Sequence, residues 1–104
     1  MKTRELKKYS AYFATENDQQ VSIIKKITCN IFGGYSLHSI NGGWIDSDNG
    51  KLLEESSYYL EVLTDKDIKH MKDLCDAITI IANQKEVFYF EQDVKLNIIT
   101  NKKN

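Results

Sequence analysis

The sequence predicts a single α+β domain in which four antiparallel strands carry two helices on one face. Two observations lead to this prediction. Residue patterns with a period of two and of 3.6 follow one another in the order strand, helix, strand, strand, helix, strand. The 104 residues are enough for one hydrophobic core, and no linker composition divides them. We therefore expect one domain over residues 1–104, with 1–6 and 101–104 as flexible tails.

The first strand and helix are indicated by alternation and by capping residues. Lys7–Thr15 alternates in polarity, which is typical of a strand with one buried face. Asn17 is a favourable N-cap, and Gln20, three residues later, is placed to return a hydrogen bond to its backbone. Apolar residues at helical spacing continue over 21–31, and Gly33-Gly34 then ends the helix because glycine accepts a left-handed conformation.

The next two strands form a predicted hairpin. Tyr35–Asp46 and Lys51–Leu63 alternate, and the Asp-Ser-Asp-Asn-Gly segment at 46–50 is a strong turn signal between them. Gly42-Gly43 falls inside the first of these strands. Glycine there is compatible with a turn, a bulge or a close backbone approach, and we predict a bulge or kink.

A second helix and a last strand complete the chain. Thr64 or Asp65 is the predicted N-cap, and apolar residues continue at helical spacing from Ile68 to Ala82. Lys85–Thr100 is rich in aromatic and β-branched residues, so we predict a strand that breaks near 92–93.

This order of elements is the βαββαβ pattern of ferredoxin-like domains, an α+β fold with a four-stranded antiparallel sheet. Both helices must cover the same face of that sheet. The alternation places five ring side chains on the opposite face, which makes it a candidate interface for homodimers or trimers through the sheet or its edges. They are Tyr12, His38, Tyr59, Phe88 and Phe90.

Composition excludes several classes of protein. The chain is 41% hydrophobic and 28% charged, and no apolar run reaches the roughly 18–20 residues of a membrane span. The basic N-terminus is followed by no apolar signal core, so we expect a cytoplasmic protein. Net charge is −1, with acids concentrated over 44–67, and this distribution makes nucleic acid an unlikely partner.

The sequence shows no set of residues for metal or catalytic chemistry. Cys29 and Cys75 fall in the predicted helices, where we interpret them as small buried apolar residues; a disulfide is the alternative if the helices lie side by side. With His38 and His70 they do not form a convergent ligand set. We predict no metal, no cofactor and no catalytic residue, and we expect binding rather than catalysis.

Two glycine pairs, each followed by an aromatic residue, suggest a ligand pocket. Tyr35 and Trp44 would supply stacking surfaces, and Glu55 would accept a hydrogen bond from a ligand amine or ribose. The structural alternative is a helix stop, a bulge and a solvated glutamate. Gln84 is the fourth candidate, because we expect it to lie near Tyr35 at one end of the sheet; the alternative is that it caps the preceding helix.

These motifs resemble two groups of phage proteins. Gly34-Tyr35, Gly43-Trp44, Gly50, Glu55-Ser56 and Gln84–Val87 look like a pattern found over about residues 32–90 in small uncharacterised phage and mobile-element proteins. That resemblance implies a ferredoxin-like fold. The chain is also similar to phage S-adenosylmethionine lyases, which implies trimers with sites between subunits that use a tyrosine and a glutamate. Tyr35 and Glu55 are the nearest matches.

Three functions follow from these features. The first is a phage counter-defence protein in the host cytoplasm that sequesters a nucleotide-like small molecule as a homo-oligomer, without catalysis. The second is an inhibitor that binds a host or defence protein through the aromatic sheet face or the acidic hairpin. The third is an enzyme like the S-adenosylmethionine lyases.

Overall fold

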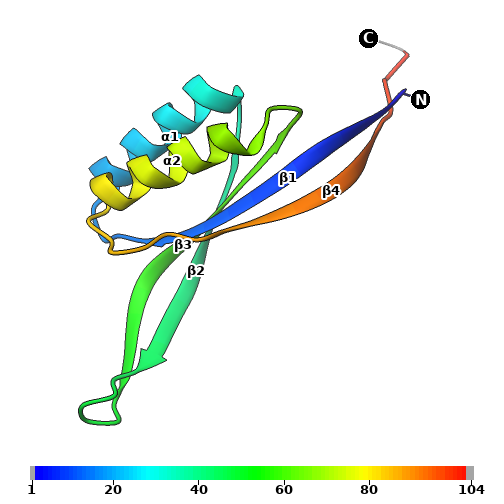
Figure 1. The fold of residues 1–104 in the computed structure, drawn as a ribbon. Helices are drawn as coiled ribbons and strands as arrows, with labels where there is room; N and C mark the ends of the chain where they lie inside the picture. Colours follow the sequence, from blue (N-terminus) through cyan, green and yellow to red (C-terminus); the bar gives the residue numbers. More distant parts are fainter. Residues whose placement is uncertain (1, 103–104) are drawn as a thin grey trace.

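The computed structural model describes residues 2–102 and contains four strands and two helices (Figure 1). They follow one another as β1 (Lys2–Ala14), α1 (Asp18–Phe32), β2 (Ser36–Ile45), β3 (Leu52–Thr64), α2 (Ile68–Ile81) and β4 (Tyr89–Ile98). The sheet is antiparallel in the order β2-β3-β1-β4, and both helices lie on one side of it. The predicted ferredoxin-like α+β fold is therefore confirmed.

The core lies between the helices and one face of the sheet. Alternate residues of the two central strands point into it, among them Tyr9, Ala11 and Leu60, and α2 contributes Leu74 and Ile78. All five are at most 1% exposed. The apolar side of each helix packs against the alternate strand residues that are apolar. This is the packing that the alternation in the sequence predicts.

The strands are staggered, so only the middle of the sheet is four strands wide. β1 pairs with β3 from Lys7 opposite Thr64 to Ala14 opposite Ser57. Beyond that point β2 and β3 continue alone as a two-stranded hairpin, residues 41–56, which we call the arm. At the other end, residues 2–6 of β1 pair only with 94–98 of β4, and we call this part the ribbon. Arm and ribbon extend in opposite directions and give the molecule its length of 58 Å (Figure 1).

The ends of two elements, β1 and β4, differ from the sequence prediction. β1 begins at Lys2 rather than Lys7, because residues 2–6 pair with β4 instead of forming a tail. β4 begins at Tyr89 rather than Lys85, and its pairing is continuous through Gln92 and Asp93, so the predicted break is wrong. Of the predicted tail over 101–104, residues 103–104 lie outside the described part of the chain, as does Met1.

Capping of the helices is confirmed for α1 and corrected for α2. The Asn17 side chain accepts hydrogen bonds from the backbone N–H groups of Gln19 and Gln20, and Gly33 ends the helix with φ 86°. The Gln20 side chain accepts instead from the Thr15 hydroxyl, not from the Asn17 backbone. α2 is capped by Asp67, which accepts from the Lys69 N–H, and not by the two residues predicted.

The glycine pair in β2 does not form a bulge. Gly42 and Gly43 pair in unbroken register with Glu55 and Glu54. A Cβ atom on Gly42 would lie 2.5 Å from Ser57 Oγ, so this glycine serves close approach of the neighbouring strand, one of the three roles that the sequence leaves open. The turn at 46–50 is confirmed, with Gly50 at φ 70°.

Candidate functional site

A groove between α1 and the edge strand β2 is lined by Tyr35, one of the predicted site residues, together with charged and hydroxyl side chains. It consists of two adjoining hollows of about 410 Å³ and 340 Å³, and Lys25 and Tyr35 line both. The helix supplies Ser22 and Lys25, three residues apart and hence on one side of α1. β2 supplies Ser39, whose alternation points it toward the helices.

The groove combines aromatic, ammonium and hydroxyl groups with one carboxylate, that of Asp18 in the first turn of α1. The Tyr35 ring is 38% exposed and so is available for stacking. Lys25 and Lys26 offer ammonium groups to an anion, and the hydroxyl of Ser22 offers hydrogen bonds. A planar ring joined to an anionic group matches this arrangement.

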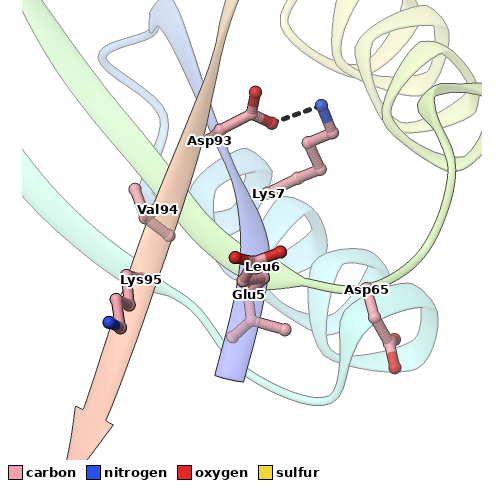
Figure 2. A pocket seen from close by; sticks show the side chains of 7 residues that line it. All are labelled: Glu5, Leu6, Lys7, Asp65, Asp93, Val94 and Lys95. Atoms are coloured by element: carbon pink, nitrogen blue, oxygen red, sulfur yellow. Dashed lines mark hydrogen bonds and ion pairs between the residues drawn. The ribbon is translucent and has the colours of Figure 1, made fainter. Parts of the chain in front are cut away.

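A third hollow, of about 610 Å³, lies beside the ribbon but is less suited to a ligand. It is lined from β1, β4 and the segment after β3 (Figure 2). Lys7 is paired there with Asp93 and, at 3.1 Å, with Glu91, and these hydrogen bonds raise the pKa of the lysine well above its ordinary value. Its charge is therefore already balanced within the chain.

The structure separates the four predicted site residues. Tyr35 precedes Ser36, which pairs with Glu61, whereas Glu55 pairs with Gly42, six positions further along the hairpin. At about 3.3 Å per residue this is roughly 20 Å. Trp44 lies further still, near the tip of the arm opposite Leu53.

Gln84 does not lie near Tyr35, so that expectation is wrong. The two helices run in opposite directions, and their C-terminal ends therefore lie at opposite ends of the sheet (Figure 1). The Gln84 side chain accepts a hydrogen bond of 2.9 Å from the Ala14 backbone N–H, where β1 ends. Its side-chain contact is therefore with the end of a strand. The Gln84 backbone N–H donates to the Thr79 carbonyl oxygen at 3.0 Å, so the residue also caps the C-terminal end of α2, as the alternative held.

Four neighbours of Tyr35 were not predicted from the sequence: Ser22, Lys25, Lys26 and Ser39. Helical spacing gives the signal for Ser22 and Lys25, but a single sequence does not say which strand edge that side of the helix faces. On the opposite side of the sheet the predicted register is confirmed: the Tyr12 ring lies 5.1 Å from that of Tyr59, which in turn lies 5.8 Å from His38.

A series of hydrogen bonds and one ion pair crosses this opposite side of the sheet. The Tyr59 hydroxyl donates to Glu61 Oε2 at 2.9 Å and is 2.8 Å from Ser10 Oγ. Lys8 Nζ lies 3.3 Å from the same Glu61 oxygen. These contacts satisfy the polar groups among the aromatic rings and fix Tyr59 in place.

Neither cysteine forms a disulfide. Cys75 is buried as predicted, and burial raises the pKa of its thiol to about 11. Cys29 is exposed and lines the groove, so its predicted burial is wrong. Within residues 2–102, no three His, Cys, Asp or Glu side chains gather closely enough to hold a metal ion, and neither helix is long and apolar enough to cross a membrane.

No family model and no curated protein sequence matches the chain. Solved structures do match it. A phage SAM lyase in complex with S-methyl-5′-thioadenosine is 11% identical, with a TM-score of 0.66, and the match covers 89% of this chain and 90% of the lyase. GlnK of B. subtilis in complex with ATP has a TM-score of 0.66 at 6% identity, over 86% of this chain and 82% of GlnK.

A third similar structure is CPII, a nitrogen regulatory PII-like protein from Thiomonas intermedia K12 bound to ADP, AMP and bicarbonate. It is 11% identical, with a TM-score of 0.60, and the match covers 95% of this chain and 100% of CPII. At these identities the likeness shows the fold. It agrees with the resemblance to S-adenosylmethionine lyases in fold, and no match supports the group of small uncharacterised phage proteins. The chain thus has the ferredoxin-like fold of the lyase, GlnK and CPII.

Proposed function

We propose that the protein binds a nucleotide-like small molecule without catalysis, as a homo-oligomer, and that the groove between α1 and β2 holds the ligand. The observation that carries this proposal is the position of Tyr35 beside Lys25 and Lys26 in one groove. An aromatic ring and two ammonium groups suit a ligand with a base at one end and a phosphate at the other.

Similar structures support the class of ligand. The three solved structures are described as complexes with S-methyl-5′-thioadenosine, ATP, or ADP and AMP. All of these ligands contain adenosine or a close derivative of it. We therefore propose an adenine nucleoside or nucleotide as the first ligand to test. That the binding serves phage counter-defence is a finer proposal, which rests on the sequence resemblance.

Calorimetric titration of the purified chain with AMP, ATP and S-methyl-5′-thioadenosine tests the proposal. Base stacking on an aromatic side chain contributes about 1–3 kcal/mol, so we expect Tyr35→Ala to weaken binding by roughly 5- to 150-fold. Lys25→Gln should weaken binding of the phosphorylated ligands more than that of the thioadenosine. Lys72→Gln makes the same charge change at an exposed position of α2 and should leave binding unchanged.

Two results would contradict the groove as the site. One is that none of the three ligands binds. The other is that Trp44→Ala or Glu55→Gln weakens binding while Tyr35→Ala does not, since these residues lie on the arm. Incubation with S-adenosylmethionine and chromatography of the products tests the absence of catalysis.

A further inference from the structure

The sheet face opposite the helices, which we call the open face, has its charges divided between two halves. Strand alternation and the cross-strand pairs assign the residues to it. From β1 and β4 its charged side chains are Lys2, Arg4 and Lys8, all cationic. The acidic residues of those two strands, such as Glu5 and Asp93, point to the helix side.

The other half of the open face has the opposite charge. From β3 it carries Glu55 and Glu61, and β2 contributes His38 but no lysine or arginine. At the seam between the halves, Lys8 and Glu61 pair at 3.3 Å. Away from this seam, charges lie at the two ends of a molecule 58 Å long: Lys2 and Arg4 on the ribbon, where Arg4 has an ion pair with Asp65, and Glu55 on the arm. Arg4 reaches Asp65 at 3.5 Å, and its side chain is still 56% exposed.

Large apolar side chains lie between and around these charges. The exposed fractions are 59% for Phe88, 54% for Phe90, 49% for Trp44, 45% for Leu63 and 37% for Leu53. With about 150–250 Å² for an aromatic side chain, these five residues leave roughly 400–500 Å² of apolar surface uncovered. A stable interface takes about 800 Å² from each partner, a little over half of it apolar, so this face has the apolar area of one such interface.

We propose that a second copy of this chain covers the open face, with the cationic half of one copy over the anionic half of the other. A face with one positively charged half and one negatively charged half is complementary to a second copy of itself that is rotated by 180°, because unlike charges then face each other. A nucleic acid would be attracted by one half and repelled by the other. The contact places the ribbon of one copy against the arm of the next, and so brings the partner subunit's cations next to Glu55 and Trp44.

This inference rests on the homo-oligomeric part of the proposed function and names the surface that forms it. Sedimentation velocity of the full chain at about 50 mM and 500 mM salt tests the assembly. We expect a dimer that dissociates more readily at the higher salt, because exposed charges are screened over about 10 Å at 0.1 M.

Charge reversal tests the pairing of the halves. Arg4→Glu and Glu55→Arg should each raise the dissociation constant about tenfold or more, and the double variant should recover to within about threefold of the original chain. Glu5→Lys reverses a charge on the helix side of the same ribbon and serves as the matched control, with no expected effect on association. Phe90→Ser should weaken association without any change in charge, and circular dichroism verifies that each variant is folded.

A monomeric chain at all salt concentrations would overturn the inference, as would an oligomer that ignores both charge reversals and Phe90→Ser, or a double variant that does not recover. Calorimetric binding of AMP or ATP by such a monomer would leave the ligand proposal standing. An oligomer that responds as expected but binds none of the tested ligands would support the inference and remove the ligand proposal.

Discussion

Two isoleucines of α2, two positions apart, offer a direct test of which side of the helix faces the sheet. Ile78 is fully buried in the core, whereas Ile80 is 80% exposed. Replacing either one by alanine removes the same three carbon atoms. At about 0.8 kcal/mol for each buried carbon, Ile78→Ala loses about 2.4 kcal/mol of transfer free energy, and the cavity left behind adds to it. We expect a total of about 3–4 kcal/mol.

Ile80→Ala should have almost no effect on the free energy of unfolding. Its side chain is already in water, and alanine has the better helix propensity by a few tenths of a kcal/mol. For a domain of this size the loss at Ile78 corresponds to a fall in Tm of roughly 12–30 °C. Urea unfolding and thermal scans of both variants measure the difference.

The matched pair gives a clear criterion for refutation. Equal destabilisation by the two substitutions, or a larger effect at Ile80, would mean that α2 packs with a different side against the sheet. The assignment of the open face depends on that packing and would then be wrong as well. An unchanged denaturant slope in both variants would show that only the stability of the native state has changed.

Three further perturbations test local features of the fold. Asn17→Ala should cost about 1 kcal/mol because two backbone N–H groups lose their acceptor, and Asn17→Ser should restore most of it in urea unfolding. A thiol reagent at about pH 8 should modify Cys29 quickly and Cys75 only after denaturation, since burial raises the Cys75 pKa to about 11; modification of both in the native protein would contradict the packing. The hydrogen bond from His70 lowers the Asp67 pKa, so the stability it contributes is present above the ordinary carboxyl pKa and is lost as pH falls through the lowered value. Acid unfolding of His70→Gln should show a smaller loss over that range, and an unchanged pH profile would refute this linkage.

The order and type of all six elements could be predicted from the sequence because each is marked by local chemistry. The alternation of Tyr9, Ala11 and Phe13 places a strand, and Asn17 and Gly33 mark the two ends of a helix. The residues of the open face were also predictable, since Tyr12 and Tyr59 alternate with core residues along their strands and therefore point to the opposite side of the sheet.

Element ends that depend on pairing between distant segments were not predictable. Residues 2–6 look like a polar tail in isolation, and they form a strand because residues 94–98 lie beside them. Asp67 was missed as the cap of α2 because Thr64 and Asp65 carry equally suitable oxygens, and only the length of β3 decides among them. The neighbours of Tyr35 are fixed in the same way, by which edge of the sheet α1 covers.

Trp44 and Glu55, the two predicted site residues on the arm, cannot share a binding site with Tyr35 of the same chain. Gly42 has no side chain, and this lets the Ser57 side chain lie over β2 at a distance that a Cβ atom would not allow. Two large side chains, Trp44 and Glu55, are then left on the open face of the arm, and Trp44 is half exposed. In one chain both residues are more than roughly 20 Å along the hairpin from Tyr35. A role in ligand binding for Trp44 and Glu55 therefore requires a second copy, whereas the role proposed for Tyr35 does not. A variant made monomeric by Phe90→Ser separates the two: it should keep the affinity that the groove provides and lose any contribution from the arm.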